Sequence, residues 1–200
     1  GGSKVAIVFC EGQITSGKSR PGSSMGSDTI AKAIRRAREN DDVGAVVLRV
    51  NSPGGSGLAS DIIWREVELT QDAGKPVVVS MSDLAASGGY YIAMGADAIV
   101  AQPTTLTGSI GVYAGKYDIG GLYEKVGLTS ETIKRGEYSD LFDLNRSLGE
   151  QGTEKLEQFV DGFYDTFLTK AAEGRGTSTD AVHAVAQGRV WTGEQADDVG

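Results

Sequence analysis

The segment PVVVSMSDLAASGGYY, residues 76–91, decides the predicted fold. Residues 76–81 are apolar and rich in valine, as is typical of a buried strand, and Ser87 follows among small residues that open a helix. A serine at this position presents its hydroxyl beside backbone N–H groups that have no acceptor within the helix. Ala85-x-Ser87-x-Gly89 is also close to the G-x-S-x-G spacing of nucleophile elbows. The segment indicates a serine nucleophile; the alternative is a small residue in a tight helix–strand contact.

Strands and helices alternate on both sides of this segment, which predicts the α/β class. A Gly- and Ser-rich loop is expected over 11–26, and Ser27 can cap the helix that follows it. Expected strands are 4–10, 43–50, 76–81, 98–101, 130–134 and one beginning at 188; a strand is also expected after the loop 107–112. Expected helices are 27–39, 58–71, 87–94, 122–126, 149–174, one ending near 187, and one from 193. The helix over 149–174 carries an apolar stripe of Leu156, Phe159, Val160, Phe163, Phe167 and Leu168.

Length and composition bound the possibilities. Two hundred residues with 40% hydrophobic content suit a single domain over 1–200, in which 149–200 forms a helical extension. The net charge of -8 argues against nucleic acid as a partner. Cys10 is the only cysteine and His183 the only histidine, so neither a disulfide within the chain nor a cysteine- or histidine-based metal site is expected. No apolar run approaches the ~20 residues of a membrane helix.

Two further segments bear on the chemistry. In residues 51–57 a glycine pair, Gly54-Gly55, follows a buried strand, and such a pair lets exposed N–H groups approach a ligand closely. This predicts an oxyanion hole or a groove wall, with an ordinary strand–helix turn as the alternative. The segment has neither the P-loop nor the dinucleotide-binding spacing, so no cofactor is expected. In residues 107–112 two glycines flank Ser109, which could orient another polar group or simply form a turn.

A serine nucleophile needs a group that accepts its proton. His183 lies in the middle of a predicted helix, where a structural role is favoured. A lysine could serve if burial lowered its pKa from ~10.4. Lys116, Lys125 and Lys134 follow Ser87, but none has apolar sequence neighbours that would predict burial, so a solvated surface role is favoured for each. The base is therefore not found by local pattern.

Taken together, four ordered motifs resemble the signal peptide peptidase A family, the bacterial membrane-bound Ser/Lys proteases related to the Clp protease and crotonase folds. The resemblance runs from about Lys4 to Gly200, and its motifs are Arg49–Gly55, Ala86–Tyr91, Thr107–Val112 and Gly188–Gly193. It implies a Clp protease/crotonase-like spiral of ββα units with flanking helices. It further implies Ser87 as the catalytic nucleophile, the N–H groups of Gly54 and Gly88 as the oxyanion hole, and Ser109 holding the base lysine. A peptide substrate would bind in an extended conformation.

The chain departs from the family pattern at the base. Short members of the family carry the lysine in the stretch after Lys134, where this chain has Ser139 at the expected position. In long members the amino-terminal half supplies the lysine and the carboxy-terminal half supplies the serine. This chain resembles such a carboxy-terminal half, so we expect a piece of a longer chain that holds the nucleophile without its base and is inactive alone. Lys134 swinging into the site is the alternative.

The resemblance implies a serine endopeptidase that degrades apolar peptides, such as cleaved signal peptides, through an acyl-enzyme on Ser87. It implies a homo-oligomer that is membrane-associated at full length, with the catalytic domain outside the cytoplasm and the fragment itself soluble. Two alternatives belong to other classes. One is a non-catalytic half that keeps the fold for assembly. The other is a crotonase-type acyl-CoA enzyme, in which Ser87 would have no role.

Overall fold

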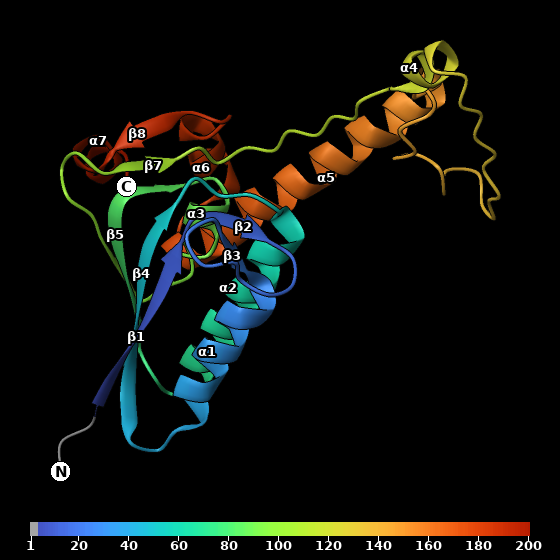
Figure 1. Ribbon diagram of the computed structural model, residues 1–200. Coiled ribbons are helices and arrows are strands. Elements are labelled where there is room, and N and C mark those ends of the chain that lie inside the picture. Colours follow the sequence, from blue (N-terminus) through green and yellow to red (C-terminus); the bar gives the residue numbers. More distant parts are fainter. Residues whose placement is uncertain (1–3) are drawn as a thin grey trace. The chain divides into compact units, whose positions relative to one another are not determined.

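The computed structural model describes residues 4–200 and divides into two compact units (Figure 1). The first contains the residues up to Gly111 together with Tyr164–Gly200, and the second contains Val112–Phe163. The expectation of one peptidase-like domain, with 149–200 as its helical extension, stays a prediction.

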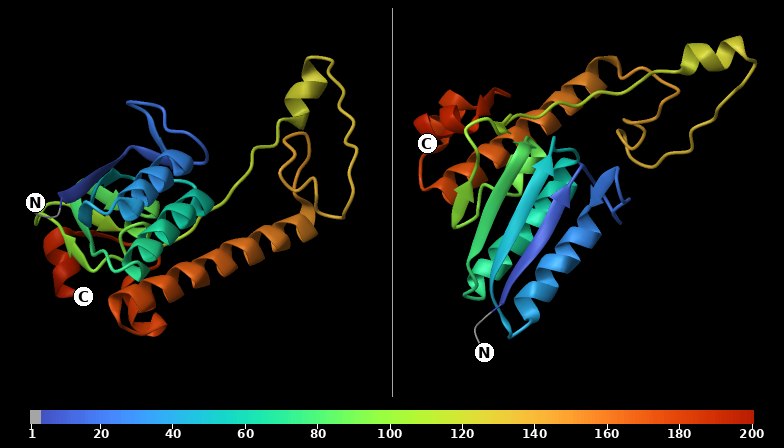
Figure 2. Two further views of the ribbon diagram at one scale, coloured as in Figure 1. Left: turned by 90° about the horizontal axis from the view of Figure 1, so that it is seen from below. Right: turned by 60° about the vertical axis from the view of Figure 1, so that its left-hand side comes forward.

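The first unit is built on a largely parallel sheet, whose long strands lie side by side in Figure 2. The strand order is β1-β4-β5-β7-β8, with β6 also paired to β5. Strands β1, β4, β5, β6 and β7 run parallel to one another, and β8 is antiparallel to β7. The bounds are Lys4–Glu11 for β1, Val43–Ser52 for β4, Val77–Ala86 for β5, Ala98–Val100 for β6, Leu106–Gly108 for β7 and Val190–Thr192 for β8.

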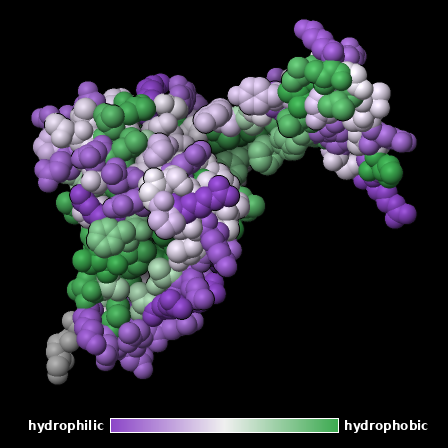
Figure 3. Space-filling view, viewed as in Figure 1, coloured by the Kyte–Doolittle hydropathy of each residue, from purple (hydrophilic) through white to green (hydrophobic). Residues whose placement is uncertain are grey.

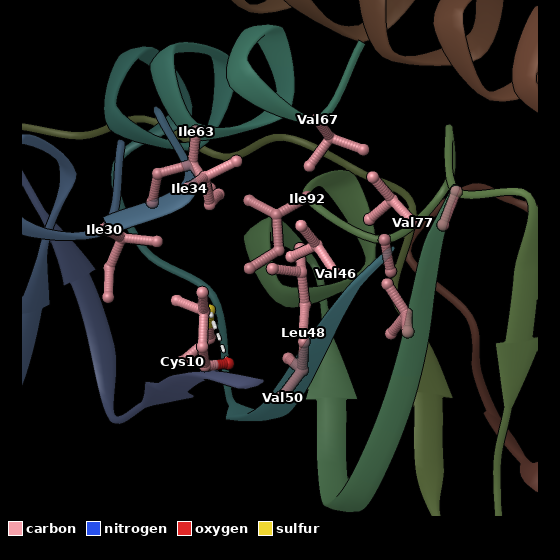
Figure 4. Packing of buried hydrophobic residues seen from close by; sticks show 14 of the residues in the cluster. Cys10, Ile30, Ile34, Val46, Leu48, Val50, Ile63, Val67, Val77 and Ile92 are labelled. Atoms are coloured by element: carbon pink, nitrogen blue, oxygen red, sulfur yellow. Dashed lines mark hydrogen bonds between the residues drawn. The ribbon is translucent and has the colours of Figure 1, made fainter. Parts of the chain in front are cut away.

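Two long helices, α1 (Ser27–Glu39) and α2 (Gly57–Asp72), cover one face of this sheet. Alternate residues of β1, β4 and β5 point toward the helices and are buried, as the period of two in a strand requires. Figure 4 shows Val46 and Leu48 of β4 packed with Ile34 of α1 and Ile63 of α2. Cys10 lies in the same core, where burial raises the pKa of its thiol to about 12, so it is an apolar packing residue.

The opposite face of β1 exposes large apolar side chains. Val5, Ile7 and Phe9 are each more than half exposed, and Figure 3 shows hydrophobic residues gathered over this strand. Parallel sheets are ordinarily covered on both faces.

Within residues 4–200, no helix is both long and apolar enough to cross a bilayer.

Tertiary pairing changes several boundaries expected from the sequence. Strand β5 extends to Ala86 rather than ending at Met81, because its last residues pair with β7. The strand beside Ser109 precedes this residue as β7, whereas one was expected after it.

The region 11–26 was expected to be a loop and contains β2 (Gln13–Thr15) and β3 (Ser24–Gly26), which pair with each other. The N-cap of α1 is Gly26, and the Ser27 hydroxyl instead accepts a hydrogen bond from the Gly17 amide.

The remaining helices include the longest of the chain. Helix α3 spans Gly88–Tyr91, α6 spans Thr179–Val185, and α7 spans Gly193–Asp198. Helix α5 (Gly149–Arg175) begins in the second unit and ends in the first, where Phe167 and Leu168 are buried. The expected apolar stripe is therefore confirmed at those two positions and at Leu156, which is 8% exposed, whereas Phe159 is 58% exposed.

The second unit has little regular structure besides its part of α5 and the short helix α4 (Gly120–Lys125). The strand expected over 130–134 is absent from the structure, and Ile133 is 95% exposed. Within the described residues, no neighbouring strand pairs with this segment, and an isolated strand leaves its backbone without partners.

Candidate active site

The three segments singled out in the sequence follow the carboxyl ends of adjacent strands. Gly54 comes two residues after β4, Ser87 directly follows β5, and Ser109 directly follows β7. Because β4, β5 and β7 are neighbours and run parallel, their carboxyl ends lie at one edge of the sheet. Ligands of open α/β sheets bind outside this edge. The structure thus brings Gly54, Ser87 and Ser109 together, although they are spread over 55 positions of the sequence.

Ser87 is the N-cap residue of α3 and has a backbone conformation that is rare for a residue with a side chain. Its φ is 53° and its ψ is -120°. Its amide donates to the Gly108 carbonyl at 2.9 Å, and its carbonyl accepts from the Tyr91 amide at 2.9 Å. Such a conformation costs about 1–3 kcal/mol and persists only where the surroundings impose it. Ser87 is partly exposed, whereas its neighbours Ala86 and Gly88 are buried.

Gly54 lies directly against the Ser87–Gly88 peptide. A Cβ placed on Gly54 would come within 2.5 Å of the Gly88 nitrogen and 2.9 Å of the Ser87 Cβ, and the φ of Gly54 is +93°. Only glycine fits this position. The Gly54 amide donates to the Ser52 hydroxyl at 3.1 Å, while this hydroxyl donates to the Gly12 carbonyl at 2.7 Å.

The amide of Gly88 belongs to the first turn of α3, where N–H groups have no acceptor within the helix. Gly88 is buried, and a Cβ on it would come within 2.5 Å of the Ser60 Oγ. The two glycines expected to supply oxyanion donors are therefore in close contact: a Cβ on Gly88 would also lie 3.2 Å from the Gly54 Cα.

Ser109 has the same kind of backbone strain as Ser87, with a φ of 50°. Within residues 4–200 three residues other than glycine have positive φ, and two of them are these serines. The Ser109 amide donates to the Arg189 carbonyl at 2.7 Å. The motif Gly188–Gly193 therefore supports the turn of Ser109, through β8 paired to β7. Local pattern could not reveal this role, because the two segments are 80 positions apart in the sequence.

The candidate base lysines lie in the second unit and bind groups of that unit. The Lys116 amine donates to the carbonyls of Asp143 at 2.6 Å and Leu141 at 3.2 Å. The Lys134 amine donates to the Asp140 carboxylate at 2.9 Å and to the Glu137 carbonyl at 3.0 Å. This hydrogen bond from Lys134 holds the pKa of Asp140 below its ordinary value.

The remaining candidate positions are exposed side chains, most of them hydrogen-bonded to groups outside the candidate site. Lys125, at the end of α4, is exposed. Ser139 donates to the Gly136 carbonyl at 3.1 Å.

His183 is exposed in α6, with its Nδ1 3.0 Å from the Tyr164 hydroxyl and its Nε2 3.0 Å from the Gln187 side-chain nitrogen. These contacts fit the structural role expected of His183.

Sequence reasoning did not single out three residues, one of them in α3, whose polar side chains are joined by hydrogen bonds. Asp61 of α2, Tyr91 of α3 and Lys170 of α5 form one hydrogen-bonded cluster. Their spacing in the sequence carries no signal, because three separate helices bring them together. Among residues 4–200 there is no group of three or more His, Cys, Asp or Glu side chains arranged to hold a metal.

Solved structures share the fold. A mutant of the 1510-N membrane-bound stomatin-specific protease matches with a TM-score of 0.64 and 19% identity, over 100% of this chain and 78% of that chain. A ClpP1 mutant from Listeria monocytogenes matches with a TM-score of 0.62 and 15% identity, over 97% of this chain and 86% of that chain. The expected Clp protease/crotonase-like α/β fold is thereby confirmed.

Curated proteins are similar in sequence. The chloroplastic serine protease SPPA of Arabidopsis thaliana is 45% identical over 100% of this chain and 30% of its own length. Protease 4 of Salmonella typhi is 40% identical over 98% of this chain and 31% of its own length. A putative protease of Synechocystis sp. is 34% identical, and here the match covers 98% of this chain and 68% of the relative.

The chain thus spans less than a third of the length of the first two relatives. The family model described as peptidase family S49 matches residues 70–200, a span that contains Ser87, Gly88, Ser109 and the motif Gly188–Gly193. The match covers well over half of the chain, and the relatives named as signal peptide peptidase A or Protease 4 agree with it. The chain belongs to peptidase family S49.

Proposed function

We propose that this chain is the nucleophile-bearing part of a serine endopeptidase in which Ser87 forms an acyl-enzyme. The observation that carries the proposal is the strained turn of Ser87, which lies at the carboxyl edge of the sheet against Gly54 and Gly108. Strained serines between a strand and a helix are typical of nucleophile elbows. Membership in peptidase family S49 supports peptidase chemistry.

In the proposed reaction the Ser87 Oγ attacks the peptide carbonyl carbon while a lysine amine takes the hydroxyl proton. The carbonyl oxygen becomes an oxyanion, which accepts hydrogen bonds from the amides of Gly54 and Gly88. The C–N bond then breaks, and the lysine ammonium gives its proton to the leaving amine. A water molecule, deprotonated by the same lysine, attacks the acyl carbon, and the Ser87 oxygen leaves with the proton. Each oxyanion donor is typically worth about 10²–10³ in kcat.

The Gly54 amide would change partner during this reaction. In the structure it donates to the Ser52 hydroxyl at 3.1 Å, which is at the long end of the N–H···O range. A developing oxyanion is the stronger acceptor, because a charged partner roughly doubles the strength of a hydrogen bond. Ser52 would then keep its hydrogen bond to the Gly12 carbonyl.

We assign the base to a lysine from another part of the longer protein, the amino-terminal half that the resemblance implies. One implication of the resemblance and one observation support this choice. The resemblance implies a lysine in short family members at the position where this chain has Ser139, and the Lys134 amine donates hydrogen bonds to Asp140 and Glu137. Ser109 would hold the incoming amine, since its strained turn follows β7 beside that of Ser87.

The substrate would be an extended apolar peptide, such as a cleaved signal peptide, and the full-length protein would act at a membrane as a homo-oligomer. The similarity to proteins named signal peptide peptidase and to a membrane-bound protease supports this part of the proposal. The exposed apolar face of β1 fits a protein whose sheet is covered in an assembly.

The test is labelling of the full-length protein with a fluorophosphonate probe. The wild type is expected to be labelled, whereas Ser87→Ala is expected to lose both labelling and peptide hydrolysis. Ser109→Ala should retain labelling at a reduced rate, because this hydroxyl orients the base rather than attacking. Undiminished hydrolysis by Ser87→Ala would contradict the assignment and favour a non-catalytic, assembly role for this chain.

A further inference from the structure

The nucleophile turn rests on a helix that is too short to maintain its own shape. Helix α3 has four residues, Gly88–Tyr91, and its N-cap Ser87 makes no side-chain capping hydrogen bond. Isolated helical turns are unstable because nucleation fixes several dihedral angles for one hydrogen bond. The strained conformation of Ser87 must therefore be imposed by what α3 packs against.

Tyr91 links this turn to the rest of the unit. Its amide donates to the Ser87 carbonyl at 2.9 Å, and its side chain is only 1% exposed. Its hydroxyl donates to the Asp61 carboxylate at 2.7 Å. Burial, and then the hydrogen bond to Asp61, raise the pKa of Tyr91, so the hydroxyl remains a donor at neutral pH.

Asp61 receives a second hydrogen bond, from the Lys170 amine of α5. The Lys170 amine also lies 3.5 Å from the centroid of the Trp64 ring, which is cation–π geometry. The cluster thus joins α2, α3 and α5 by a charged pair, a phenol and an aromatic ring. The side chains of Lys170 and Asp61 are 19% and 37% exposed, so solvent screens this pair in part, but less than it screens a fully exposed pair.

Aromatic packing fixes the same group of side chains. The Tyr91 ring lies 4.7 Å from that of Phe167 and 6.3 Å from that of Trp64, the latter edge to face. The Trp64 indole nitrogen is buried and has no hydrogen-bond partner among the described residues, so packing holds this ring. Helix α5 also approaches the segment after α3 closely: a Cβ on Gly174 would come within 2.4 Å of the Met94 carbonyl oxygen.

We propose that Asp61, Tyr91 and Lys170 are positioning residues that hold the Ser87 turn in its attacking geometry. They act through the main chain: Tyr91 fixes the end of α3 and, by its amide, the Ser87 carbonyl. This inference rests on the proposed role of Ser87. Displacing a nucleophile by about 1 Å can cost about 10²-fold in rate, so a small loosening of α3 is enough to lower kcat.

The experiment uses the full-length protein and three variants that keep the side-chain shape. Tyr91→Phe removes only the hydroxyl, Asp61→Asn removes the charge, and Lys170→Met removes the amine. Each is expected to lower kcat and the rate of fluorophosphonate labelling by about 10- to 100-fold, with KM changed less than about three-fold. The matched controls are Asp72→Asn on α2 and Lys32→Met on α1, both exposed, which are expected to keep wild-type rates.

A double variant separates positioning from general destabilisation. Because the three side chains form one unit, Tyr91→Phe combined with Lys170→Met should be about as slow as the slower single variant. Rates are compared per folded molecule, with the folded fraction taken from far-UV circular dichroism at the assay temperature. A merely structural role predicts a lower Tm with wild-type kcat in the folded fraction, and this result would overturn the inference.

The inference and the proposed function fail in different ways. If Ser87→Ala keeps full activity, the proposed function fails, and with it the reason for a positioning cluster. If Ser87→Ala is inactive while Tyr91→Phe keeps wild-type kcat and labelling rate, only the positioning inference is overturned.

Discussion

Ser87 and Gly54 show how strongly the geometry of the candidate site depends on single backbone positions. Ser87 keeps a positive φ although it carries a side chain, and at Gly54 there is no space for a side chain. The Ser87 turn is held on both sides of the residue: Gly54 lies against the peptide between Ser87 and Gly88, and the Gly108 carbonyl accepts a hydrogen bond from the Ser87 amide. The strain at Ser87 is therefore supported by neighbouring strands rather than by local sequence.

At the residue scale we predict that Gly54→Ala removes activity. The new Cβ would lie within 2.5 Å of the Gly88 nitrogen, so the two proposed oxyanion donors could not keep their positions. We expect kcat to fall by about 10²-fold or more, as for loss of an oxyanion donor. The free energy of unfolding should fall by about 1–3 kcal/mol from strain. Peptide hydrolysis and urea unfolding of the full-length protein measure the two effects.

Gly74→Ala is the matched control for that substitution. Gly74 also has a positive φ, +79°, but a Cβ there would meet no atom within 4 Å. It should lose about 1 kcal/mol of stability through backbone strain and keep wild-type kcat. Equal loss of kcat in the two variants would show that backbone strain alone, and not contact with Gly88, explains the effect at Gly54.

At the scale of elements, two ion pairs to one buried carboxylate join the two helices that cover the sheet. The Glu66 side chain of α2 is 5% exposed and accepts hydrogen bonds from Arg35 and Arg38 of α1. The hydrogen bond to Glu66, followed by the charge of this carboxylate, raises the pKa of Arg35. A buried carboxylate requires such partners, because water no longer solvates it.

We predict that Arg38→Met destabilises the first unit by about 1.5–3 kcal/mol, the range for hydrogen bonds to charged groups. Glu66 would then retain only Arg35, whose side chain is 52% exposed. Arg65→Met is the matched control, since it removes the exposed pair between Arg65 and Glu68 on α2. That pair should contribute about 0.5 kcal/mol or less. Urea unfolding measures the free energy of unfolding of the two variants. Equal losses of stability in Arg38→Met and Arg65→Met would contradict the role assigned to Glu66.

At the scale of the whole molecule, the question is which part of the protein supplies the base. We predict that Lys134→Met leaves kcat of the full-length protein within about two-fold of wild type. The Lys134 amine donates hydrogen bonds to Asp140 and Glu137, both in the second unit, and this use of its protons does not fit a base that accepts one. Steady-state peptide hydrolysis provides the measurement. A fall of about 10³-fold, the scale seen when a catalytic group is lost, would instead identify Lys134 as the base.

The sequence alone determined the α/β class, the order of most elements and the residues of the candidate site. Valine-rich runs over 43–50 and 76–81 predict buried strands, and glycines soon after them mark close backbone contacts; both signals are local and survive in the linear chain. The extension of β5 to Ala86 and the loss of a strand at 130–134 could not be predicted, because each depends on whether a partner strand lies alongside.

Only the tertiary structure decided which segments meet. It placed Ser109 beside Ser87 through the parallel pairing of β5 and β7, and it supported Ser109 with the Arg189 carbonyl from the far end of the chain. It also assembled Asp61, Tyr91 and Lys170 from three helices. Contacts of this kind depend on sheet order and helix packing, for which spacing along one chain carries no information.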